Sequence, residues 1–150
     1  MKVRLAVSKE NYEKIKCALT ELGIEIDDSS ELMISESNKF IDNLVVKDMK
    51  SSSHIVLSSD DIVYIESFGH SIEVHTQYNT YQALDRLYKI CNMLDPDKFL
   101  RISNSVIIAK NKVNKIDPTL TRKFILTMTN GRTVDVTRSY YYIFKEHFGI

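Results

Sequence analysis

The chain has 150 residues, 43% of them hydrophobic, and its 20 basic residues balance its 20 acidic ones. This length fits one ordinary domain, or a small domain with a compact appendage, and the composition excludes wholesale disorder. No apolar run approaches the roughly 20 residues that cross a bilayer, and the N-terminus becomes charged too early for a signal peptide. We therefore expect a soluble, cytoplasmic protein.

The N-terminal residues predict a strand followed by a helix. Residues 2–7 (KVRLAV) have the apolar content of a strand, and Ser8 is placed to cap a helix over residues 9–22. The helix is expected to stop at Gly23, which suits a left-handed C-terminal cap. Its expected apolar face consists of Tyr12, Ile15, Leu19 and Leu22.

A polar stretch marks the expected domain boundary. Three short strand candidates follow the helix, at residues 24–27, 32–35 and 43–47. The serine-rich stretch KDMKSSSH (47–54) then interrupts the pattern, as linkers and loops do. We therefore divide the chain into a small α/β N-terminal extension, residues 1–50, and a second domain, residues 51–150.

Short strands separated by turn residues fill the second domain, and Gly69-His70 is one of the expected turns. The strand candidates are residues 55–58, 62–67, 71–76, 99–102, 106–109, 112–116, 123–129 and 132–137. Apolar spacing predicts one helix over residues 83–94 and a last helix over 140–148, capped by Ser139. The buried face of the last helix is expected to be Ile143, Phe144 and Phe148. One or two helices among many strands indicate a mainly β, α+β fold.

The hairpin around Asn130-Gly131 allows two registers. A two-residue turn mixes apolar and polar residues on each face. A three-residue loop over 129–131, with Gly131 in a left-handed bulge, instead pairs Val134 with Leu126 and keeps the faces apart. We prefer the second register.

The net charge of zero hides an asymmetry. Residues 1–97 hold 10 basic and 17 acidic residues, whereas residues 98–150 hold 10 basic and 3 acidic ones. Such asymmetry is a hint of nucleic-acid contact. The preferred hairpin register also sets Arg138 opposite Arg122, with Lys123 beside them. Three cations at one end of a hairpin repel one another unless they are solvated or face an anion.

A string of motifs covers roughly two-thirds of the chain: IVYIESFGHSIEVHT, then a helix, FLRISNSVIIAKNKVNKI, and an NG hairpin leading into VDVTRSYYYIF. In this order the motifs resemble the LytTR family of bacterial DNA-binding domains. The resemblance implies an elongated stack of small antiparallel sheets that reads double-stranded DNA with loops. It implies a transcriptional regulator that contacts short direct repeats in successive major grooves and the minor groove between them.

The resemblance also implies which residues touch DNA. The base-contacting positions fall on His70, Asn104 and Arg138, and Ser71 is an alternative for the first. The positions suited to phosphate contacts are Arg101, Ser105, Lys110, Arg122, Lys123 and Ser139. Arg101 has a second reading, because it alternates with apolar neighbours and can lie on the outer face of a sheet.

The chemistry of the three base-contacting side chains suits this role. The guanidinium fork of Arg138 can grip O6 and N7 of guanine. Asn104 can donate and accept hydrogen bonds in one plane, although asparagine is also common in left-handed turns. His70 follows a glycine in a turn, so we expect it to be exposed and able to donate to guanine or phosphate.

Many members of the family carry a receiver domain in front of the DNA-binding domain. Residues 1–50 are too few for one, so we expect a stand-alone regulator with a short N-terminal extension. The sequence leaves three roles open for this extension: it forms a homodimer, senses a ligand, or supports the fold.

A small enzyme and a basic module that does not read duplex sequence are the competing classes. The four glycines form no phosphate-binding loop, and no nucleophile–base pair stands out. His70 and His75 lack a third ligand at a recognisable spacing, and the two cysteines are too few for a zinc site. We expect no cofactor, metal, membrane partner or small-molecule substrate, and we read His75 as structural. The alternative function is a basic RNA-binding or protein-interaction module that does not read duplex sequence.

Overall fold

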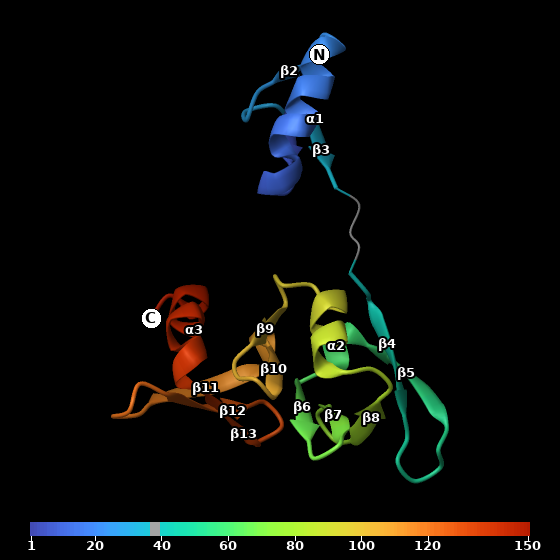
Figure 1. Cartoon of the computed structure of the whole chain (residues 1–150), viewed down its shortest axis with the longest axis vertical. Coiled ribbons are helices and arrows are strands. Elements are labelled where there is room, and N and C mark those ends of the chain that lie inside the picture. Colours follow the sequence, from blue (N-terminus) through green and yellow to red (C-terminus); the bar gives the residue numbers. More distant parts are fainter. Residues whose placement is uncertain (37–39) are drawn as a thin grey trace. The chain divides into compact units, whose positions relative to one another are not determined.

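The computed structural model describes residues 1–36 and 40–150. It divides the chain into two compact units, residues 1–39 and residues 40–150. The first unit has a three-stranded parallel sheet in the order β2-β1-β3 and one helix, α1, which Figure 1 shows with β2 and β3. Its elements are β1 (Lys2–Ala6), α1 (Lys9–Glu21), β2 (Glu25–Ile26) and β3 (Met33–Ser35).

Helix α1 begins at the predicted residue and ends one residue earlier than predicted, and it buries less than its pattern indicated. Gly23 adopts the left-handed conformation (φ +79°) just after the helix, as predicted. Ser8 occupies the N-cap position without capping the helix, since its hydroxyl donates to Glu36 Oε1 (2.9 Å). The prediction that Leu22 belongs to an inner face is wrong, because this side chain is 76% exposed. Only short strands lie beside the helix, and they cannot cover its last turn.

The boundary between the two units lies earlier in the sequence than the polar stretch 47–54, which was predicted to contain it. Strand β4 (Asn43–Lys47) pairs antiparallel with β5 (His54–Ser58), so most of that stretch is the turn of a hairpin. Leu44 and Val46 are buried in the core of the second unit. The alternating apolar residues of β4 need a large core, and the first unit does not offer one.

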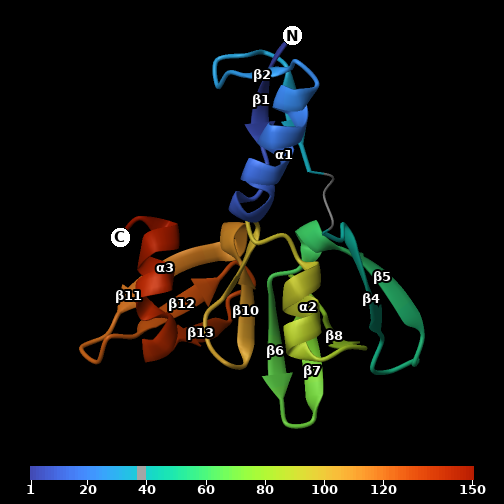
Figure 2. The same cartoon turned by 45° about the horizontal axis from the view of Figure 1, so that its top comes forward.

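The second unit is built on a seven-stranded antiparallel sheet in the order β5-β4-β8-β7-β6-β10-β9. Its remaining strands are β6 (Tyr64–Phe68), β7 (Ser71–His75), β8 (Thr80–Ala83), β9 (Phe99–Arg101) and β10 (Val106–Ala109). Helix α2 (Leu87–Met93) packs on the sheet through residues such as Ile90, which is fully buried beside Ile65 and Val74 (Figure 2).

The helix predicted over residues 83–94 is shorter in the structure. Strand β8 occupies its first residue and pairs with both β7 and β4. Leu84 and Tyr88, two members of the apolar spacing, are each 53% exposed. Ala83 instead fills a place in the sheet core, where a small residue is accommodated between larger ones. Pairing with two neighbouring strands outweighed the local helical pattern.

A second antiparallel sheet, in the order β11-β12-β13, carries the last helix. Its elements are β11 (Val113–Pro118), β12 (Phe124–Met128), β13 (Thr133–Val136) and α3 (Tyr141–Phe148). The preferred hairpin register is confirmed, because Leu126 lies opposite Val134 and Gly131 is left-handed (φ +82°). Phe144 of α3 is fully buried among the residues of this sheet.

Two expectations for the last helix are wrong. Ser139 does not cap it, since Ser139 lies within a short 3-10 turn, Arg138–Tyr140, and α3 begins only at Tyr141. Ile143 is 47% exposed, so Phe144 and the partly buried Phe148 form the inner face without it. The 3-10 turn changes where each side chain points relative to a helix that starts at residue 140.

The mainly β, α+β prediction is confirmed: the described residues form three helices, two antiparallel sheets and the small parallel one. Two hydrophobic clusters divide the second unit. One lies between the seven-stranded sheet and α2, and the other lies between β9, β10, the three-stranded sheet and α3. Within the described residues, no helix combines the length and the apolar character needed to cross a membrane.

Candidate nucleic-acid interface

The turn between β6 and β7 and the turn between β9 and β10 lie at the same end of the seven-stranded sheet (Figure 2). Strands β6 and β10 run antiparallel with Glu66 opposite Val106, so the turn after β6 and the turn before β10 come together. The Ser67 amide donates to the Ser105 carbonyl (2.8 Å) and joins the two turns directly. His70 and Asn104, at the tips of these turns, are both exposed. Two of the three predicted base-contacting residues therefore share one edge.

Arg101 builds the turn that presents Asn104. Its Nε donates to the Ser103 carbonyl (3.1 Å) and its Nη2 donates to the Asn104 carbonyl (2.7 Å). The Ser103 hydroxyl accepts from the Ser105 amide (3.2 Å) and completes the turn. The guanidinium of Arg101 thus stabilises the backbone of the turn. The alternation of apolar and polar residues in β9 did not predict this role.

A broad, open groove of about 980 Å³ gathers most of the remaining predicted contacts. It brings together five predicted DNA-contacting residues, Asn104, Ser105, Lys123, Arg138 and Ser139. The Thr137 amide donates to the Ile102 carbonyl (3.1 Å), which ties the end of β13 to the turn after β9. Two acidic residues, Glu66 and Asp135, also line the groove.

Tyr140 orients Asn104 within this groove. The Tyr140 hydroxyl donates to Asn104 Oδ1 (3.2 Å), so one acceptor of the amide is already in use. The amide nitrogen, Nδ2, remains as the group that Asn104 can offer outward. Sequence reasoning missed this contact because the two residues are 36 positions apart.

The cations at the open end of the β12–β13 hairpin carry no ion pair. No carboxylate oxygen of the described residues lies within 4.0 Å of Arg122, Lys123 or Arg138. Arg138 Nε donates to the Thr121 carbonyl (3.2 Å), and Arg122 reaches the Tyr142 hydroxyl (3.5 Å). The strand pairing ends at Phe124 and Val136, so the predicted pairing of Arg138 with Arg122 is wrong. Lys123 and Arg138 line the groove, whereas Arg122 does not.

Lys110 lies away from this cluster. It follows the last residue of β10, whereas Ser105 precedes the first. Five residues of extended chain separate the two by about 16 Å, at roughly 3.3 Å per residue. The Lys110 amine contacts His147 Nδ1 (2.9 Å) of α3. His70 shares the edge with Asn104 but does not line the groove.

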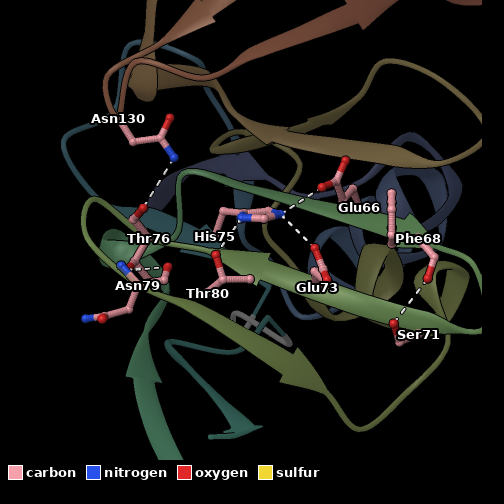
Figure 3. A network of polar contacts seen from close by, with 9 residues as sticks. All are labelled: Glu66, Phe68, Ser71, Glu73, His75, Thr76, Asn79, Thr80 and Asn130. Atoms are coloured by element: carbon pink, nitrogen blue, oxygen red, sulfur yellow. Dashed lines mark hydrogen bonds and ion pairs between the residues drawn. The ribbon is translucent and has the colours of Figure 1, made fainter. Parts of the chain in front are cut away.

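His75 is buried at the centre of a polar network on the β6–β7 hairpin (Figure 3). Its Nδ1 lies 2.9 Å from Thr80 Oγ1, its Nε2 lies 2.9 Å from Glu66 Oε1, and its ring stacks on Tyr64. Burial, with a smaller effect from the nearby Glu66 carboxylate, raises the pKa of the Tyr64 hydroxyl. Tyr64 therefore stays protonated at neutral pH.

The sequence contains a signal for this network. A two-residue turn at Gly69-His70 sets Glu66 opposite Glu73 and Tyr64 opposite His75, and this is the observed register. Spacing along the chain does not show that Glu66 and Glu73 meet His75 across the paired strands, so sequence reasoning missed both glutamates.

Comparisons with known proteins identify a family and agree with the fold. The model of the LytTr DNA-binding domain family matches residues 52–149. A transcriptional regulatory protein LytR from Staphylococcus aureus is 23% identical over 124 residues, which is 83% of this chain and 50% of that protein. A sensory transduction protein LytT from Bacillus cereus is 30% identical over 88 residues, which is 59% of this chain and 36% of that protein.

A solved structure shares the fold. The LytTr DNA-binding domain of a methyl-accepting/DNA response regulator from Bacillus cereus superposes with a TM-score of 0.68 at 24% sequence identity. The match covers 73% of this chain and 99% of that one. By contrast, the chain spans about half the length, or less, of the curated relatives it matches.

Proposed function

The chain belongs to the LytTR family of DNA-binding domains, and from this premise we propose that it is a sequence-specific, cytoplasmic transcriptional regulator without catalytic activity. It binds promoter DNA at short direct repeats. Loops between strands enter successive major grooves, and the minor groove between them is contacted as well. The competing function is a basic module that binds RNA or protein without reading duplex sequence.

One observation carries this proposal: a single exposed groove is lined by side chains that suit both bases and phosphates. Arg138 provides a planar fork for guanine, and Asn104 lines the same groove. Lys123, Ser105 and Ser139 supply charge and short polar groups for the sugar–phosphate backbone, which fixes the register of a protein on DNA. His70, on the neighbouring turn, reaches the next part of the duplex.

A competition between nucleic acids tests the function. In fluorescence anisotropy at moderate salt, the chain is expected to bind a labelled duplex carrying its promoter repeats more tightly than single-stranded RNA or a shuffled duplex. The salt concentration must be held constant, because phosphate contacts make every affinity salt-dependent. Equal affinity for the duplex and the RNA favours the competing function.

Tyr140→Phe is expected to change the base preference at the position that Asn104 reads. The phenylalanine keeps the ring but removes the hydroxyl that holds Asn104 Oδ1. A hydrogen bond of this kind contributes about 0.5–1.5 kcal/mol, so discrimination should fall roughly two- to ten-fold at that base pair. Anisotropy with duplexes substituted one base pair at a time measures the change. Tyr78→Phe, at a tyrosine that is 90% exposed, is the control; unchanged preference in Tyr140→Phe contradicts the assigned orientation.

Lys123→Ala and Lys110→Ala are expected to weaken binding to all duplexes alike. Each removes one phosphate contact, so the slope of log K against log salt should become shallower by about 0.9. Lys89→Ala, at an exposed lysine of α2, should leave the slope unchanged. A slope that changes for Lys123→Ala alone would limit the DNA-contacting surface to the groove.

The first unit is proposed to form a homodimer. Parallel sheets normally have both faces covered, yet α1 has no buried residue and Val3 is the sole buried hydrophobic residue among residues 1–36. A second copy of the unit can cover this exposed surface. Sedimentation equilibrium of the full chain is expected to give a dimer, and a monomer across the concentration range excludes it.

A further inference from the structure

Two carboxylates and a buried imidazole converge on one face of the β6–β7 hairpin (Figure 3). Glu66 pairs directly with Glu73 across the two strands. One donor atom each from Glu66, Glu73 and His75 lies within 4.8 Å of the others. The His75 side chain is 2% exposed, whereas those of Glu66 and Glu73 are 25% and 24% exposed. The donors are therefore shielded by protein but reachable from solvent.

These side chains need a positive charge between them. Like charges directly opposite each other on paired strands destabilise a sheet. No Lys or Arg nitrogen of the described residues lies within 4.0 Å of either carboxylate. At that range both carboxylates face only His75 Nε2, at 2.9 Å from Glu66 and 3.4 Å from Glu73. A metal ion bound at Nε2 can supply the charge.

We propose that Glu66, Glu73 and His75 bind one divalent transition-metal ion, for which Zn²⁺ is the best match. Zn²⁺ accepts imidazole nitrogen and carboxylate oxygen at about 2.0–2.2 Å in tetrahedral sites, where neighbouring ligand atoms are about 3.3 Å apart. The 3.4 Å separation of Nε2 from Glu73 already fits this arrangement. The 2.9 Å separation from Glu66 requires a widening of about 0.4 Å.

The surroundings of His75 are those of a metal ligand. Metal-binding histidines usually hydrogen-bond through the second ring nitrogen, which fixes the tautomer and the ring orientation. Here Nδ1 lies 2.9 Å from Thr80 Oγ1, and Tyr64 stacks on the ring with the centroids 4.3 Å apart. Zn²⁺ with three protein ligands keeps a fourth position for water, which the partly exposed glutamates allow.

A bound ion acts on the DNA-facing edge. The site joins β6 to β7 below the turn that carries His70, and Glu66 lines the groove. A divalent ion offsets two negative charges beside a surface that meets phosphates, and so reduces repulsion. This consequence rests on the proposed DNA-binding function, whereas the metal site does not.

Isothermal titration calorimetry of Zn²⁺ into the metal-free full chain tests the site without DNA. The wild type is expected to bind one ion per chain. Glu73→Gln keeps the shape of the side chain without its charge, and it is expected to bind at least about ten-fold more weakly, as is Glu66→Gln. His54→Gln, at an exposed histidine of β5, should match the wild type. Equal affinities of Glu73→Gln and the wild type overturn the site, as does non-saturable binding by the wild type.

A duplex-binding titration in Zn²⁺ or in EDTA tests the coupling. The wild type is expected to bind the duplex several-fold more tightly in Zn²⁺, and Glu73→Gln should bind equally in both conditions. Saturable Zn²⁺ binding with unchanged duplex affinity supports the site and overturns the coupling. Absence of duplex binding in both conditions contradicts the proposed function and leaves the calorimetric result in force.

Discussion

Arg138→Ala is expected to remove about 1–3 kcal/mol of discrimination at one base pair of the DNA site. Arg138 is exposed at the groove and makes no ion pair with a carboxylate of the described residues. Its Nε donates to the Thr121 carbonyl, which leaves the two terminal nitrogens of the fork for a base. A bidentate contact of this kind distinguishes guanine from other bases.

Anisotropy titrations with a duplex panel, changed one base pair at a time, measure this loss. Arg138→Lys is the matched control, because it keeps the charge but cannot form the fork. It should lose discrimination at the same base pair while retaining affinity for non-specific DNA. If Arg138→Ala instead weakens all duplexes equally, Arg138 contacts phosphate and not a base.

Phe144→Ala is expected to lower the free energy of unfolding by about 3–5 kcal/mol. Phe144 is fully buried, and its ring lies against Phe124 (5.1 Å between centroids) and Phe148 (4.6 Å). Removal of the ring leaves a cavity between α3 and the three-stranded sheet, where the neighbours can relax only in part. Because the sheet carries Lys123 and leads into Arg138, a loosened core should weaken DNA binding as well.

Urea denaturation followed by circular dichroism measures the loss of stability. Ile143→Ala is the control, because Ile143 adjoins Phe144 in the sequence but is 47% exposed. It should change the free energy of unfolding by less than about 1 kcal/mol. The apolar pattern of the last helix predicted both residues to be buried, so equal losses in the two variants would favour that pattern over the structure.

Sequence patterns predicted the hairpins well. The β12–β13 register followed from the loop and from the segregation of apolar residues, and the observed pairing of Leu126 with Val134 confirms it. Gly23 and Gly131 were assigned to left-handed positions and are found there. Turn chemistry and alternation act over a few residues, so a local pattern contains them.

Patterns failed where distant segments compete for the same residues. Residues 83–94 have helical spacing, but Ala83 belongs to β8, where it pairs with Val46 of β4, while the residues before it pair with β7. The polar stretch 47–54 has the composition of a linker, yet the pairing of β4 with β5 makes it a hairpin turn. In both cases the deciding interaction comes from outside the segment.

By itself, the sequence determined the family, the mainly β class and the positions of most strands, because these follow from motifs and from the alternation of neighbouring residues. Only the tertiary structure decided which side chains meet. It brings Tyr140 onto Asn104, and it joins Thr137, at the end of β13, to Ile102, in the turn after β9. Such contacts depend on how two sheets dock and on which strands pair, and no pattern within a single segment records that.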